Sequence, residues 1–179
     1  SDQWRAYSRN AFRRTPMLGT HSMGFVFRSD NRQGNGGGAR TLVAQKGYID
    51  IREQGDKLLI EVDGHLMEIA FPKRASQCSS VVISSILRKN NQILLTENSV
   101  STIQVYVNGE PALLSKYRNR ERNTASPQNP LRVRISTGNE GGWYMPRISQ
   151  AILSTRYFRP EEVAGQIHPE LIKSCMESL

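Results

Sequence analysis

From Leu42 onward, apolar residues recur at every second position, and turn-forming residues interrupt the pattern about every eight to twelve residues. A strand that buries one face against a core shows this period of two, because successive side chains point to opposite sides. Many short strands at even spacing are typical of two antiparallel sheets stacked as a β-sandwich. The sequence therefore predicts an all-β fold, and its 179 residues suit a single domain over 1–179.

Two dipeptides mark tight hairpins. Asp63-Gly64 separates the apolar stretches 58–62 and 65–71, and Asn108-Gly109 follows the alternating stretch 102–107. Such pairs accept the positive φ angles that a two-residue hairpin loop requires. Further strands are expected at 24–28, 42–44, 48–51, 81–87, 92–96, 111–114, 131–135, 148–153 and 156–158, with an exposed loop over 115–130.

Both ends of the chain carry helix signals. A short amphipathic helix is predicted over 2–14, within an N-terminal lead-in, 1–20, that is helical or extended. A second short helix is predicted over 160–166, because Pro160 suits a first helical turn and two acidic residues follow it near the positive end. The apolar residues with helix-like spacing in the lead-in are Trp4, Tyr7, Ala11 and Phe12.

The charge balance favours an anionic partner. The chain has 24 lysines and arginines against 16 aspartates and glutamates, which gives a net charge of +8. Arginine forks match carboxylate, sulfate and phosphate groups, although a generally basic, soluble surface is an equal alternative. Nucleic acid ranks low, because aromatic and basic strand positions do not interleave. No apolar run of about 18 residues is present, so no membrane insertion is predicted within this chain.

The chain has two cysteines, Cys78 and Cys175. A bond between them would close a loop of about 100 residues and stabilise the fold by up to about 4 to 5 kcal/mol on the chain-entropy model. Pairing is favoured because both lie in polar stretches, where free thiols are a liability in a secreted protein. The alternative is two unrelated thiols.

The second half of the chain resembles a laminin-G-like, concanavalin A-like lectin domain. The residues that carry the resemblance are a strand ending in Tyr-Val-Asn-Gly at 106–109, an alternating strand at 131–136, and a last strand that runs through aromatic residues into Glu-Glu-Val at 161–163. The first half agrees more loosely, at 25–27, 41–43 and 49–62. The resemblance covers most of the chain beyond Gly24.

The resemblance implies a jelly-roll pair of antiparallel sheets on a secreted or cell-surface protein. It also implies that rim loops bind a glycan or a protein ligand, often with calcium beside them. Calcium needs several oxygen ligands that converge on one rim. The candidates, Asp30, Asn31, Asn139 and Glu140, are scattered in the sequence, so the metal stays open.

Two loops are the best candidates for ligand binding. Around the glycines at 141–142, aromatic faces lie beside polar groups, a combination that suits sugar rings. The alternative is that these aromatic residues only cover the end of the core. In the loop after residue 115, alternating arginines could clamp acidic groups, or they could be a solvated charge run. The predicted ligand residues are Asn139, Glu140, Trp143 and Tyr144 in one loop, and Arg118, Asn119, Arg120 and Arg122 in the other.

Catalysis is not predicted. Retaining glycosidases with this type of sandwich place two carboxyl groups about 5 Å apart on one strand face. The acids available here are Glu61, Asp63 and Glu68, but Asp63 lies in a turn and Glu68 lies on the returning strand. The leading hypothesis is therefore a non-catalytic, lectin-like adhesion module. The alternatives are a structural or interaction domain of a surface assembly, such as a pilus or pseudopilus subunit, and a basic binder of nucleic acid or another polyanion.

Overall fold

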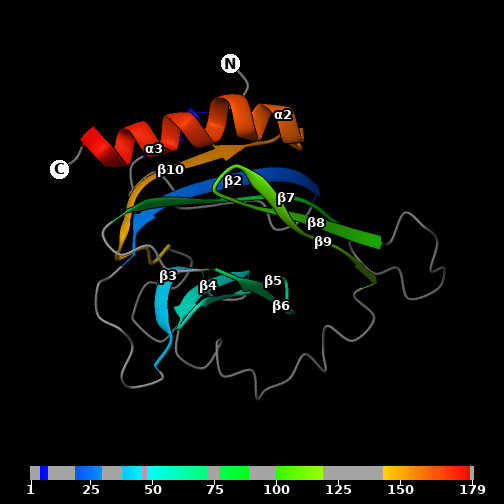
Figure 1. The fold of residues 1–179 in the computed structure, drawn as a ribbon. Helices are drawn as coiled ribbons and strands as arrows, with labels where there is room; N and C mark the ends of the chain where they lie inside the picture. Colours follow the sequence, from blue (N-terminus) through cyan, green and yellow to red (C-terminus); the bar gives the residue numbers. More distant parts are fainter. Residues whose placement is uncertain are drawn as a thin grey trace.

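Two antiparallel sheets face each other in the computed structural model, and a C-terminal helix covers the outer side of the larger sheet (Figure 1). This arrangement confirms the predicted two-sheet β-sandwich. The single-domain assignment over 1–179 stays a prediction. The structure describes residues 5–7, 19–29, 38–45, 48–71, 77–88, 100–118 and 143–177.

The large sheet has six strands that come from distant parts of the chain. Its order is β1-β10-β2-β7-β8-β9, and every neighbouring pair is antiparallel. The alternation of small or polar residues with large apolar residues gives this sheet two different faces. The strands are β1 (Arg5–Tyr7), β2 (Gly19–Arg28), β7 (Cys78–Leu87), β8 (Val100–Val107), β9 (Glu110–Arg118) and β10 (Ile148–Ser154).

The small sheet is a meander of four consecutive strands in the order β3-β4-β5-β6. The hairpin at Asp63 and Gly64 has φ angles of 50° and 81°, and the one at Asn108 and Gly109, in the large sheet, has 50° and 84°. Both predicted hairpins are therefore confirmed, with the positive φ values that such loops require. The strands are β3 (Arg40–Gln45), β4 (Ile49–Gln54), β5 (Lys57–Val62) and β6 (His65–Ala70).

The main core lies between the two sheets. Strands of both sheets contribute apolar side chains, and aromatic rings meet across the interface: Phe27 of β2 lies against Phe71, with ring centroids 5.8 Å apart. Burial of this apolar surface is the main stabilising force of such a sandwich. The largest fully buried members are Phe25, Phe27, Phe71, Met23, Leu42, Ile49, Ile51, Leu58 and Ile60.

A second apolar cluster joins the outer face of the large sheet to the helix. The helix runs through α2 (Pro160–Glu162), the π-helical η3 (Val163–Ile167) and α3 (His168–Glu177). Cys78, at the start of β7, is disulfide-bonded to Cys175 of α3, so the predicted pairing is formed. The buried members of this cluster are Val26, Val82, Tyr106, Ile152, Phe158, Val163, Ile167, Leu171 and Cys175.

The helix predicted over 2–14 is not formed at the residues that the structure describes there, which are extended, the other alternative for the lead-in. Arg5–Tyr7 form β1, which pairs with Ala151, Ile152 and Leu153 of β10. The backbone groups at the edge of β10 gain hydrogen-bond partners from this pairing, and tertiary context of that kind overrides local helical spacing.

Three other boundaries differ from the sequence predictions. Residues 115–118, predicted as the start of an exposed loop, belong to β9, which continues to Arg118 and pairs with β8. The rest of that predicted loop lies outside the described residues. Residues 156–158 are not a strand but cross the outer face of the large sheet. The predicted helix over 160–166 extends to Glu177, because its buried face packs on the sheet. The predicted strands at 92–96 and 131–135 lie outside the described residues.

Candidate functional site

The segment around Tyr144 extends the small sheet beyond β3. The Ala44 N–H donates to the Tyr144 carbonyl at 2.8 Å, and the Tyr144 N–H donates to the Ala44 carbonyl at 2.7 Å. Because consecutive side chains of an extended segment point to opposite faces, Trp143 and Met145 enter the core while Tyr144 points outward. Its side chain is 45% exposed.

Trp143 lies in the core, not at the surface. It is 9% exposed, its ring meets Tyr48 edge-on at 6.1 Å, and its centroid is 6.3 Å from that of Phe25. This placement favours the alternative that Trp143 covers the end of the core. A ligand at this edge would therefore meet Tyr144, held in place by the buried neighbours on either side.

The strand register places three charged side chains, Asp50, Arg52 and Glu61, on the outward face of the small sheet. Asp50 and Glu61 lie on the same cross-strand row as Tyr144. Ala44 pairs with Asp50, and Asp50 pairs with Glu61. Arg52, on the same face of β4, contacts Asp50 through Nε and Oδ1 at 3.1 Å. Although the face points away from the core, the side chains of this group are almost completely buried.

The buried position of Asp50 changes its acidity. Burial raises the pKa of Asp50 to about 6, and the charge of Glu61 adds to this, while Arg52 opposes it. Among the described residues, its Oδ2 atom has no hydrogen-bond partner. Asp50 and Glu61 are 1% and 2% exposed, so a substrate has no access to this pair of carboxyl groups in the structure.

The three acids weighed as hydrolytic candidates do not come together. Asp63 is in the hairpin turn, with a φ of 50°. Glu61 lies opposite Leu66, whereas Glu68 lies opposite Leu59 and forms an exposed ion pair with Lys57 at 2.6 Å. The three carboxyl groups therefore lie on different elements and not along one strand. The sequence spacing predicted this separation.

Arg118, the described residue of the predicted arginine site, lies at a different edge of the molecule from Tyr144. Arg118 is the last residue of β9, the edge strand of the large sheet, and its side chain is exposed opposite Val100. β9 packs over β6, as the stacked rings of Tyr117 and His65 show, whereas Tyr144 adjoins β3 at the opposite edge of the small sheet. The structure therefore does not bring Arg118 and Tyr144 together. The remaining predicted ligand residues, Asn119, Arg120, Arg122, Asn139 and Glu140, lie outside the described residues.

The calcium candidates are also outside the described ranges: Asp30, Asn31, Asn139 and Glu140. Within those ranges, no three histidine, cysteine, aspartate or glutamate side chains are grouped to hold a metal ion. In the same part of the chain, no helix is both long enough and apolar enough to cross a bilayer.

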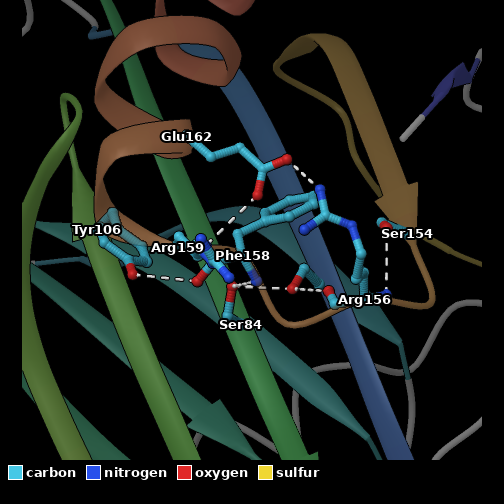
Figure 2. Close-up of polar contacts among 8 residues, drawn as sticks. Ser84, Tyr106, Ser154, Arg156, Phe158, Arg159 and Glu162 are labelled. Atoms are coloured by element: carbon cyan, nitrogen blue, oxygen red, sulfur yellow. Dashed lines mark hydrogen bonds and ion pairs between the residues drawn. The ribbon is translucent and has the colours of Figure 1, made fainter. Parts of the chain in front are cut away.

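A polar network that the sequence did not reveal seats the segment after β10 on the large sheet (Figure 2). The Phe158 N–H donates to Ser84 Oγ at 3.2 Å, and the Phe158 carbonyl accepts from the Tyr106 hydroxyl at 3.5 Å. Ser22 Oγ, 2.8 Å from Ser84 Oγ, donates to the Arg156 carbonyl at 2.5 Å. The only sequence signal is two serines, one in β2 and one in β7, at strand positions where a larger residue would have kept this segment away.

The guanidinium of Arg156 completes the network. It pairs with the Glu162 carboxylate, as Figure 2 shows. Its central carbon lies 5.6 Å from the centroid of the Phe158 ring. The other oxygen of Glu162 accepts from the Arg159 N–H at 3.4 Å and so closes the first turn of the helix. Because the Arg156 guanidinium contacts both the Phe158 ring and the Glu162 carboxylate, this network anchors the start of the helix on the sheet and leaves little room for a ligand.

Solved structures resemble the chain, although no protein-family model and no curated protein matches its sequence. The binding domain of botulinum neurotoxin DC, in complex with rat synaptotagmin II, has a TM-score of 0.54 and 12% identity over 94% of this chain and 39% of that chain. A structure concerned with the cell entry of botulinum neurotoxin type C has a TM-score of 0.53 and 10% identity over 94% and 39%. The binding domain of botulinum neurotoxin serotype D has 0.51 and 10% over 87% and 38%.

This chain thus spans about two fifths of the length of these structures. At such low identity the likeness concerns the fold alone. It agrees with the two stacked sheets described above, and the chain shares the β-sandwich architecture of these toxin binding domains.

Proposed function

We propose that this chain is a non-catalytic binding module of the lectin-like β-sandwich type, which recognises a glycan or a protein at the edge marked by Tyr144. The observation that carries the proposal is an exposed aromatic ring on a rigid support. Two backbone hydrogen bonds to Ala44 and two buried neighbours hold Tyr144 in place. A ring that is already ordered loses little entropy when a ligand stacks on it.

The similar structures support a binding role for such a sandwich. One is a complex with rat synaptotagmin II, a protein, and another concerns cell entry that depends on interaction with two ganglioside molecules. Both kinds of ligand are therefore compatible with this architecture. The net charge of +8 favours an acidic ligand over a neutral one.

We further propose that the module acts in a secreted or cell-surface protein. The bond between Cys78 and Cys175 supports this location, because disulfides form and persist mainly in oxidising compartments.

A glycan array and a heparin column at physiological salt test the proposal. We expect the wild-type chain to bind, Tyr144→Ala to weaken binding at least about tenfold, and Tyr144→Phe to stay near wild type because the ring is kept. Met176→Ala is the matched control, since Met176 is a large apolar side chain on the helix that is 55% exposed, against 45% for Tyr144. Absence of binding to every glycan and to heparin, or equal binding by Tyr144→Ala, would contradict glycan recognition.

A protein-interaction domain within a surface assembly is the second candidate. The favouring observation is β9, a nine-residue strand at the edge of the large sheet that exposes Leu114 by 54%. An edge strand of this length can pair with another chain. Light scattering after size exclusion should then show a stable oligomer that Leu114→Asp disrupts and Tyr144→Ala does not. A monomer at all concentrations would exclude self-assembly through β9.

A further inference from the structure

All three histidines of the chain join one layer of the fold to another. His21 of β2 reaches across the core to the Tyr48 hydroxyl of the small sheet. His65 of β6 reaches the opposite way, with Nε2 2.7 Å from Ser115 Oγ of β9. His168 of α3 lies on the other side of the large sheet, with Nδ1 2.7 Å from Ser80 Oγ.

The two histidines between the sheets lie at the same end of the sandwich. In the large sheet, His21 pairs with Ser85, Ser85 with Ile103, and Ile103 with Ser115, so the contacts of both histidines fall on one cross-strand row. In the small sheet, His65 pairs with Val62, which pairs with Ile49, the residue after Tyr48. We call the contacts of His21 and His65 across this end the histidine seam.

The two histidines of the seam differ in their exposure to water: His21 is buried, and His65 is half-buried. His21 is 2% exposed, and its Nε2 also lies 3.3 Å from Ser85 Oγ. Burial lowers the pKa of His21 to about 4. His65 is half-buried, with its ring stacked on Tyr117 at 4.1 Å, and burial lowers the pKa of His65 as well.

Among the described residues, the titratable groups that face the histidine seam are Tyr48, Tyr117 and Asp63. The Asp63 N–H donates to the Tyr48 carbonyl at 2.7 Å, and the charge of Asp63 contributes to the raised pKa of Tyr48, so the Asp63 carboxyl lies at this end of the sandwich too. A carboxylate or a stacked phenol ring would favour a protonated imidazole. For His21, burial outweighs the hydrogen bond with the Gly19 backbone, which acts to raise the pKa. For His65, burial is the cause of the lowered pKa, so the neutral form of both histidines is preferred.

We propose that the histidine seam is a proton-sensitive clasp, which loosens the contact between the two sheets at this end when the solution becomes mildly acidic. Protonation places a positive charge between the sheets, where it is poorly solvated. The disulfide between Cys78 and Cys175 keeps the helix on the large sheet meanwhile. The loosening is therefore confined to the side of the small sheet.

The direction of the pH dependence follows from the folded-state pKa values. The unfolded chain binds protons at the ordinary histidine pKa of 6.5, and the folded chain binds them only at lower pH. Stability from the seam is therefore complete above pH 6.5 and declines as the pH falls toward 4. For His21 alone, the unfolding equilibrium constant should rise on the order of tenfold between pH 7 and pH 5.

Trp143 provides a direct reporter of the clasp, because its ring packs against Tyr48, the partner of His21. In a Trp4→Phe background it is the only tryptophan. We expect its emission to shift reversibly to longer wavelength, and acrylamide quenching to increase, as the pH falls from 7.5 to 4.5. Far-UV circular dichroism should stay sheet-like over the same range.

Variants assign the transition to the histidine seam. His21→Gln with His65→Gln keeps a nitrogen near each Nε2 position but cannot titrate, so the emission change should disappear. His168→Asn is the matched control, because it removes the histidine on the helix side and should leave the transition in place. An unchanged transition in the double glutamine variant would overturn the proposal.

If the double variant does not fold, the wild-type chain still decides the question. NMR titration of the histidine ring protons should give a value near 4 for His21 and a value below 6.5 for His65. Values at or above 6.5 for both would overturn the clasp, whatever the chain binds.

Discussion

Trp143 and Tyr144 are neighbours in the chain that face opposite environments. Pairing with Ala44 makes this segment extended, so one ring enters the core and the next points to solvent. The sequence predicted two aromatic residues that either bind a ligand or cover the core. It could not separate them, because the pairing partner lies in a distant strand, and only that partner sets which face each ring takes.

The two rings should therefore differ sharply in their effect on stability. We expect Trp143→Ala to lower the free energy of unfolding by about 3 to 5 kcal/mol, because it leaves a cavity against Phe25 and Tyr48. Tyr144→Ala should change it by less than about 0.5 kcal/mol. Urea denaturation at neutral pH measures both. Equal losses would contradict the placement of the segment.

Asp50 should make an opposite contribution to the pH dependence from the histidines. Its folded-state pKa of about 6 exceeds the ordinary 3.8, so the folded chain holds the proton more tightly, and wild-type stability falls as the pH rises through this window. Asparagine does not titrate. The stability of Asp50→Asn relative to wild type should therefore rise between pH 4 and pH 6 and level off above it. Urea midpoints across this range measure the difference, and a flat difference would show that Asp50 is not buried as described.

At the scale of elements, local chemistry predicted the turns better than the helix. The Asp63-Gly64 and Asn108-Gly109 hairpins depend on positive φ at residues that tolerate it, which the sequence shows directly. The helix from Pro160 ends eleven residues later than predicted, at Glu177 instead of 166. Its later turns carry few local signals and are held by Leu171 and Cys175 against the sheet.

Gly24 is the point of close approach between the helix and the large sheet. A Cβ atom there would lie 2.8 Å from Ile152 Cγ1 and 3.1 Å from Leu171 Cδ1. We expect Gly24→Ala to cost about 1 to 3 kcal/mol, because packed side chains must shift. Gly38→Ala is the control, since a Cβ meets nothing within 4 Å there. Thermal unfolding measures both, and an unchanged Gly24→Ala would mean that the helix lies farther from β2.

The disulfide should contribute much of the attachment of the helix. Cys78 and Cys175 are 97 residues apart, so the bond strongly restricts the unfolded chain. We expect the double serine variant to lose about 2 to 5 kcal/mol of unfolding free energy. Wild type measured in a dithiol reductant should show a similar loss. A variant as stable as the oxidised wild type would contradict a stabilising role.

At the scale of the molecule, the sequence predicted the two-sheet architecture but not how distant parts meet. Alternation and turns define strands locally, whereas the pairing of Arg5–Tyr7 with β10 depends on residues at the other end of the chain. For the same reason, the sequence could not show that Tyr144 and Arg118 lie at opposite edges. It also missed the histidine seam, because His21 and His65 are unremarkable until the two sheets stack.

The two sheets should unfold together, because they share one core. Trp143 reports the edge of the small sheet, while far-UV circular dichroism reports all strands. We expect the two signals to follow one coincident urea transition at pH 7.5, as in most single domains of this size. Transitions that do not coincide would show that the small sheet has stability of its own.

The small sheet is contiguous in the chain, and it is inserted between β2 and β7, which are neighbours in the large sheet. During synthesis, the four-strand meander can therefore form as soon as it leaves the ribosome, while β2 must wait on one side for β7 and on the other for β10. The small sheet of the nascent chain can therefore form before the large sheet is complete. The segments from Trp143 to Glu177 emerge after the strands β1 to β9, and they carry both the aromatic side chain that covers the end of the core and the helix on the outer face of the large sheet.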